Sequence, residues 1–188
     1  FFYGSSRNLF WSWYKEHAAI EIDVKNVGSI RKALKANNIG LTNIISSAKR
    51  KGVSSFDYDL TNRMYNYSFL VKPKGDIKIL CTSKAVLNEM LLKKGFFAAN
   101  KHLELVYDKD NESAFQEEFI NRIGGAGPIK KPIYRCLVLK KGYRIKCLAI
   151  PSPGSPFRGL AYFGHKKGTP TKAFLKSYLR EAFRWFLD

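Results

Sequence analysis

Apolar residues recur along much of the chain every three to four positions, the spacing of amphipathic helices. This spacing predicts helices over Arg7–Ala18, Ser29–Asn37, Ser83–Lys93 and Glu112–Ile123. Ser29 is expected to cap the second of them. A last helix is expected to follow Thr169, as its cap, and Pro170, as its first residue. Its apolar face predicts core packing by Phe174, Leu175, Tyr178, Leu179, Ala182, Phe183 and Phe186.

Continuous apolar runs predict strands at Asp76–Thr82, Arg135–Lys140 and Tyr143–Ile150. The first strand leads directly into a helix, a step typical of an α/β sheet. The other two flank Lys141-Gly142 and should form a hairpin. Ile39–Ile45 fits either a buried strand or the exit of one into a loop, and Ser54–Arg63 is expected to be loop. We expect a single domain over residues 1–188.

The chain is strongly basic. It has 188 residues, with 33 Lys and Arg against 15 Asp and Glu, and a formal net charge of +18. Such a charge attracts polyanions, so nucleic acid is the favoured partner. The alternative is a solvated basic surface without a partner. The same choice applies to a basic stripe on the last helix, formed by Lys172, Lys176, Arg180 and Arg184.

The cysteines and histidines point away from metal chemistry. The three cysteines have no Cys-x-x-Cys spacing, and the three histidines are widely dispersed. We therefore expect no metal and no cofactor. Cys81 and Cys147 lie in apolar runs, as expected for reduced core residues of a cytoplasmic protein, here one associated with a bacterial-type nucleoid. There is no run of 18 apolar residues, so no membrane partner is expected.

A stiff loop follows the strand that ends at Ile150. It contains three prolines and one glycine and includes Pro151, Ser152, Pro153, Gly154, Ser155, Phe157 and Arg158. Prolines reduce the entropy that a loop loses on binding. Two hydroxyls and the glycine amide can approach a phosphate closely. The loop therefore indicates a grip on a nucleic-acid backbone, and Phe157 or Arg158 could wedge into a duplex from which a base has left.

A second candidate segment lies at the start of the chain, where a glycine-bearing turn leads into a helix. It places Tyr3 before the turn and Arg7-Asn8 at the start of the helix. An aromatic ring can stack on a flipped base. An Asn amide can bind a base edge or position a water. Phe10 and Trp11 are expected to be ordinary core residues.

These two segments together resemble the uracil-DNA glycosylase superfamily. FFYGSSRNLFW is similar to the stretch after the first active-site motif of mismatch-specific uracil and hypoxanthine-DNA glycosylases, and IPSPGSPFRGLAYFG is similar to the second motif. The resemblance implies a three-layer α/β sandwich with a mostly parallel central sheet. It also implies that a strand and loop carrying the first motif precede Phe1.

The resemblance assigns roles residue by residue. It implies that Tyr3 stacks on the extruded base, that Asn8 is catalytic, and that Asn43 presents a base-reading amide. Arg7 and the proline- and serine-containing loop after Ile150 would hold the DNA. The implied function is hydrolytic removal of uracil or hypoxanthine from DNA in base excision repair, by a monomer that acts on a damaged or mismatched base.

Two departures from the family pattern leave alternatives open. Ile150 stands where the classical uracil enzymes have a His that stabilises the leaving base, and Gly154 stands where they have a wedge leucine. One alternative is a DNA-binding module of the same fold with weak or no catalysis. Another is a protein-interaction domain whose basicity is incidental.

Overall fold

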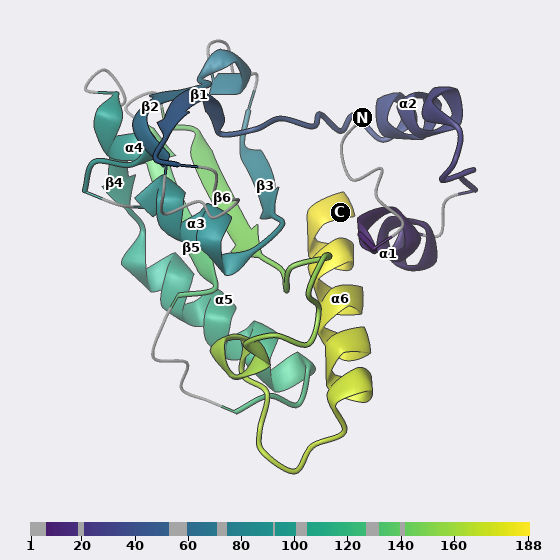
Figure 1. The fold of residues 1–188 in the computed structure, drawn as a ribbon. Helices are drawn as coiled ribbons and strands as arrows, with labels where there is room; N and C mark the ends of the chain where they lie inside the picture. Colours follow the sequence, from purple (N-terminus) through teal and green to yellow (C-terminus); the bar gives the residue numbers. More distant parts are fainter. Residues whose placement is uncertain are drawn as a thin grey trace.

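Four strands form the central sheet in the order β3-β6-β5-β4 (Figure 1). They are β3 (Ile77–Cys81), β4 (Leu105–Tyr107), β5 (Tyr134–Leu139) and β6 (Arg144–Ala149). The structure is a computed structural model that describes residues 7–18, 21–52, 60–70, 75–91, 93–100, 105–126, 132–139 and 142–188. The predicted strands at 76–82, 135–140 and 143–150 are therefore confirmed, and β4 is an addition to them.

The strand directions confirm the α/β class but not a mostly parallel sheet. Within the described residues β3 runs parallel to β6, whereas β5 is antiparallel to both β4 and β6. The connection between β5 and β6 explains the difference. Gly142, with φ 83°, closes a short turn in which its N–H donates to the Leu139 carbonyl at 2.8 Å. A connection this short joins only antiparallel strands, so the expected hairpin is confirmed and the mostly parallel arrangement is not found.

Helices cover both faces of the sheet (Figure 1). On one face Met90 of α3 places its sulfur 3.7 Å from Cys81 Sγ. On the other face the Phe115 ring of α5 stacks 3.9 Å from the Tyr134 ring of β5. The helices concerned are α3 (Lys84–Leu91) with the short α4 (Phe96–Ala99) beside it, and α5 (Lys109–Arg122) with α6 (Thr171–Leu187). The sheet is thus the middle of three layers in the described part of the chain.

Helix α1 (Phe10–His17) packs on the outer side of α6. The rings of Phe10 and Tyr14 lie 6.3 and 6.2 Å from the ring of Phe183. Phe10 and Trp11 are 6% and 3% exposed, so their expected place in the core is confirmed. The N-terminal helix is therefore attached to the sheet through α6.

The next segments depart from the sequence-based boundaries. Helix α2 (Val27–Ala36) is capped by Asn26, whose Oδ1 accepts from the Gly28 and Ser29 amides at 2.8 and 3.2 Å. Ser29 is not the cap, because its hydroxyl accepts from the Asp23 amide instead. Two strands follow, β1 (Ile45–Arg50) and β2 (Leu60–Tyr65), which form a separate antiparallel pair. The loop expected over 54–63 is thus wrong for residues 60–63, whereas 54–59 lie outside the described residues.

Helix α6 confirms the apolar face but begins one residue later than expected. The Pro170 carbonyl accepts the first helical bond, from Phe174 N–H at 3.0 Å, so Pro170 flanks the helix and Thr169 is not the cap. Two short 3-10 helices lie in the loops, η2 (Ser68–Leu70) and η3 (Leu160–Phe163). The predicted α6 face is buried apart from Phe186, which is half-buried.

The three cysteines are buried and reduced in the structure. A hydrogen bond with Cys81, together with burial, raises the pKa of Cys147 well above its usual value. Burial also raises the pKa of Cys136. All three behave as core residues, as expected for Cys81 and Cys147.

Replacing Asp76 by asparagine is expected to make stability less dependent on pH. Asp76 Oδ1 accepts from the Arg144 amide at 2.8 Å, and Oδ2 lies 3.0 Å from Lys146 Nζ. The Arg144 amide, followed by Lys146, lowers the pKa of Asp76. The charged carboxylate therefore stabilises the fold above the ordinary pKa of 3.8, and this contribution is lost as pH falls through the lower folded value.

The Asp76 side chain is 39% exposed, so the loss at pH 7 should be below about 1 kcal/mol. Urea unfolding of wild type and Asp76→Asn at pH 7 and pH 2.5 measures it. A stability difference that persists unchanged at the lower pH would contradict the assignment.

Candidate nucleic-acid interface

The parallel strands β3 and β6 end side by side, and their carboxyl ends position the candidate site. The Ile150 amide donates to the Cys81 carbonyl at 2.9 Å. The chain leaves β3 into the start of α3 and leaves β6 into the Pro-Ser loop, which we define as Pro151–Arg158. Ligands of α/β sheets typically bind beyond the carboxyl ends of parallel strands. This pair of strand ends is therefore the candidate binding position.

The Pro-Ser loop consists of two consecutive tight turns. The Ser155 amide donates to the Ser152 carbonyl at 3.0 Å, and the Arg158 amide donates to the Ser155 carbonyl at 3.1 Å. Pro151 and Pro153 are buried, whereas Gly154, Ser155, Phe157 and Arg158 are exposed. The prolines thus fix the loop on the core, and the groups expected to meet a nucleic acid face solvent. Phe157 is 51% exposed, so its ring is accessible to a nucleic acid, as a wedge requires.

The two segments singled out in the sequence meet in the structure. The Leu9 amide donates to the Pro153 carbonyl at 3.1 Å, a contact between positions 144 residues apart (153 minus 9). The adjacent Asn8 is half-buried, and its Oδ1 accepts from the Phe10 amide at 3.0 Å at the start of α1. Arg7 is exposed, and Tyr3 lies outside the described residues. Asn8 is therefore held next to the Pro-Ser loop.

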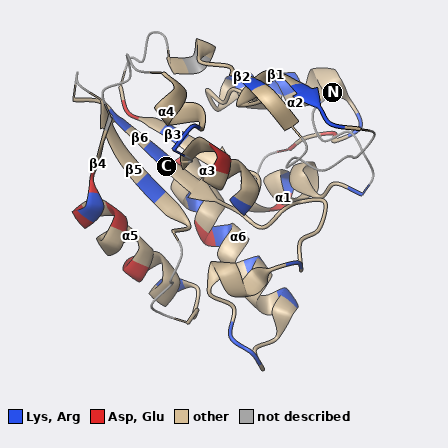
Figure 2. Ribbon diagram, turned by 60° about the vertical axis from the view of Figure 1, so that its left-hand side comes forward, with Lys and Arg blue, Asp and Glu red and all other residues tan. Residues whose placement is uncertain are grey.

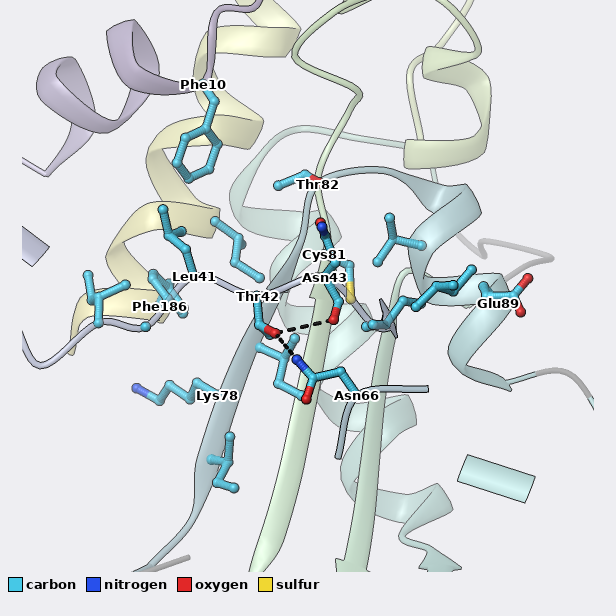
Figure 3. Close-up of a pocket in the computed structure, with 18 of the residues that line it drawn as sticks. Phe10, Leu41, Thr42, Asn43, Asn66, Lys78, Cys81, Thr82, Glu89 and Phe186 are labelled. Carbon is cyan, nitrogen blue, oxygen red and sulfur yellow. Dashed lines mark hydrogen bonds between the residues drawn. The ribbon is translucent and has the colours of Figure 1, made fainter. Parts of the chain in front are cut away.

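A cleft of about 1670 Å³ runs along β3. One wall is β3 with the flanking residues Asp76 and Thr82, and the opposite wall is the segment 37–45. Asn43 lies on this wall, exposed, and Figure 3 shows it near the end of β3 with Cys81 and Thr82. Asn66 Nδ2 holds the wall in place by donating to Thr42 Oγ1 at 2.8 Å. Asn43 thus shares a cleft with the end of β3, whereas Asn8 is not among its lining residues.

Lys84 and Tyr162 belong to the same region and were missed in the sequence. Lys84, exposed at the start of α3, has its Nζ 5.3 Å from the centre of the Tyr162 ring. The Tyr162 hydroxyl is fixed by donation to the Pro132 carbonyl at 2.6 Å. The signal available in the sequence was a lysine in the first turn of a predicted helix that directly follows a predicted strand. Lys84 adds a positive charge to the strand ends that carry the Pro-Ser loop.

The basic stripe of α6 is less available than its sequence suggests. Arg180 and Arg184 both pair with Glu181, which is only 5% exposed. Lys176 lies 3.6 Å from Glu16 of α1. Three of the four cations therefore have acidic neighbours, which favours a structural role for this stripe.

Chemically, the strand ends present hydroxyl, amide and cationic groups: Ser152, Ser155, Asn8, Asn43, Thr82 and Lys84. Such groups can bind an anion and read a base edge. No cluster of three or more His, Cys, Asp or Glu that could hold a metal occurs in the described ranges. Over the same ranges, no helix is long and apolar enough to cross a membrane.

Comparison with protein-family models, with curated proteins and with solved structures gives no match to this chain.

Proposed function

We propose that this protein is a DNA glycosylase that removes deaminated bases, uracil or hypoxanthine, from DNA. The observation that carries the proposal is the contact between the Leu9 amide and the Pro153 carbonyl. It joins the two segments on which the resemblance to the uracil-DNA glycosylase superfamily rests. Their contact brings both segments to the same strand ends, as the proposal requires.

The proposed reaction begins with the grip on the DNA backbone. The hydroxyls of Ser152 and Ser155 bind phosphates, and Arg7, Arg158 and the long-range field of a chain with net charge +18 attract the polyanion. Compression of the backbone helps the damaged nucleotide to leave the stack, which costs a few kcal/mol and less at a mismatch. Phe157 fills the vacated space, and Tyr3 stacks on the extruded base.

The geometry of Asn8 supports one of its two possible roles, binding the base. Its Oδ1 already accepts from the Phe10 amide, and we assign the chemistry to its Nδ2 donor. A donor cannot take a proton from water, but it can bind a carbonyl oxygen of the base. As the N-glycosidic bond breaks, negative charge develops on the departing base, and a fixed donor stabilises it. Asn43 reads the base edge from the wall of the cleft that faces β3.

The finer fold assignment, a uracil-DNA glycosylase-like sandwich, is part of the same proposal. The parallel β3–β6 pair and the α3 layer support it. The antiparallel β4 and β5 are where this chain departs from a mostly parallel sheet.

Replacing Asn8 by aspartate is expected to slow base release by about 10²-fold, the usual cost of one lost transition-state donor. Aspartate keeps the oxygen that accepts from the Phe10 amide and loses the Nδ2 donor, so the fold should survive. The assay incubates duplexes containing uracil, hypoxanthine or xanthine with excess protein under single-turnover conditions, and alkali then cleaves abasic sites.

Asn26→Ala is the matched control, because it removes an asparagine cap from α2 without touching the strand ends. It should lower stability by about 1 kcal/mol and leave base release unchanged. If no substrate gives strand breaks, the glycosylase proposal is wrong. Equal rates for wild type and Asn8→Asp would remove Asn8 from the mechanism.

A second candidate, DNA binding without catalysis, is favoured by one observation. Ile150 is completely buried and bonded to β3, so this position offers nothing to a leaving base. Salt-dependent binding to duplexes, without release of any base, would support this candidate. Negligible affinity at physiological salt would instead favour a protein-interaction domain.

A further inference from the structure

The β1–β2 ribbon, residues 45–52 and 60–65, stands outside the central sheet. Within the described residues β1 pairs only with β2. Residues 46–50 of β1 are all exposed, and Met64 of β2 is 64% exposed. Strands that serve the core normally bury one face. This ribbon contributes little to the core, so its exposed surface needs another explanation.

The end of β1 carries consecutive positive charges. Lys49, Arg50 and Lys51 are exposed, and the end of β1 is blue in Figure 2. The described ranges 37–52 and 60–70 contain no acidic residue. Asp57 and Asp59 belong to the intervening stretch, outside the described residues. The described part of the ribbon is therefore a cationic surface.

Specific contacts fix the base of the ribbon on α3. Glu89 of α3 accepts from Arg63 Nη1 at 2.9 and 3.0 Å and from the Tyr65 hydroxyl at 2.6 Å. Burial and the hydrogen bond to Glu89 raise the pKa of Tyr65 to about 12, so the hydroxyl stays a donor at neutral pH. A ribbon anchored in this way loses less entropy when it binds a partner than a free loop would.

The ribbon also borders the cleft that holds Asn43. Ser47 and Ala48 of β1 line it together with Thr82 at the end of β3. The partner of the ribbon would therefore lie next to whatever occupies the cleft. A polyanion with regularly spaced phosphates matches both the charge and the elongated form of the ribbon, and two-stranded ribbons fit DNA grooves.

We propose that the β1–β2 ribbon is a second DNA-contact surface, which binds the phosphates of the duplex through Lys49 and Lys51. This inference rests on the proposed function and extends it. The Pro-Ser loop holds the backbone at the damaged nucleotide, and the ribbon holds the duplex beside it. Binding through phosphates carries no sequence information, which suits an enzyme that must search all sequences for damage.

The test compares the double variant Lys49→Ala/Lys51→Ala with the control Lys32→Ala/Lys109→Ala. The control removes the same charge from exposed lysines of α2 and α5. Fluorescence anisotropy measures the affinity for a uracil-containing duplex between 50 and 200 mM salt. We expect the ribbon variant to bind about tenfold more weakly at 100 mM salt, with a salt slope shallower by about 2. The control should change the affinity by less than about threefold.

The outcomes separate the two proposals. If wild type binds and releases bases while the ribbon variant binds like the control, the ribbon proposal is overturned and the proposed function stands. Equal large losses in both variants also overturn it, because they indicate a general charge effect. If wild type neither binds DNA nor releases a base, the proposed function has failed, and the ribbon proposal fails with it. Thermal melting of each variant shows whether the fold is retained.

Discussion

Replacing Phe183 by alanine is expected to lower the free energy of unfolding by about 3–5 kcal/mol. Phe183 of α6 is completely buried. Its ring lies 6.3 Å from Phe10, 6.2 Å from Tyr14 and 5.8 Å from His17. Truncation to alanine deletes a buried aromatic ring and leaves a cavity between α1 and α6. Both effects destabilise the fold.

The Phe183 cavity should also loosen the candidate site. These three ring contacts join α1 to α6, and the start of α1 carries Asn8 and the Leu9 amide. We therefore expect faster hydrogen exchange at the Leu9 amide in Phe183→Ala, at a temperature where the variant remains folded.

Urea unfolding measures the stability part of the Phe183 prediction, with Phe157→Ala as the control. Phe157 is 51% exposed, so its truncation should cost within about 0.5 kcal/mol. A loss below about 1 kcal/mol for Phe183→Ala would show that α1 does not depend on this ring. Unchanged hydrogen exchange at the Leu9 amide would show that the Phe183 contacts stabilise the fold without fixing the geometry of the site.

The second large effect is expected for Glu112→Ala, which should cost about 3 kcal/mol. Glu112 of α5 is 6% exposed. One carboxylate oxygen pairs with Arg135, and the other accepts from the Cys136 amide at 3.1 Å. The variant leaves a partly buried guanidinium without its counter-ion and a buried amide without its acceptor. Breaking a buried pair from one side is costly because the remaining charge stays desolvated.

Two further variants isolate the cause of the Glu112 effect. Glu112→Gln keeps an acceptor for the Cys136 amide and removes only the charge, so it should lose less stability than alanine. Glu118→Ala breaks a pair with Arg122 in which both side chains are more than half exposed, and it should cost below about 1 kcal/mol. Equal losses for Glu112→Ala and Glu118→Ala in urea unfolding would contradict the assignment to burial.

Much of the secondary structure could be predicted because its signals are local. The spacing of apolar residues located α1, α3, α5 and α6 to within a few residues. The errors fell at helix ends, where competing side chains lie close in the sequence. Asn26 rather than Ser29 caps α2, because the Ser29 hydroxyl is taken by the Asp23 amide.

Strand pairing could not be predicted in the same way. The apolar runs at 76–82, 135–140 and 143–150 located β3, β5 and β6. Nothing in those apolar runs indicates which strands pair with one another. The Gly142 turn indicated one hairpin, and a mostly parallel sheet was nevertheless expected. The ribbon strand β2 was missed because a polar stretch such as Leu60–Tyr65 lacks the apolar pattern of a core strand.

By itself, the sequence determined helices α1, α2, α3, α5 and α6, three of the sheet strands, the stiff Pro-Ser loop and the strong positive charge. Each of these depends on residues near one another in the chain, through side-chain periodicity, proline geometry or simple summation. Only the tertiary structure decided that Leu9 meets Pro153, that Lys84 lies over Tyr162, and that Glu89 anchors a cationic ribbon. These contacts join residues 24 or more positions apart in sequence, so they depend on how the whole core packs.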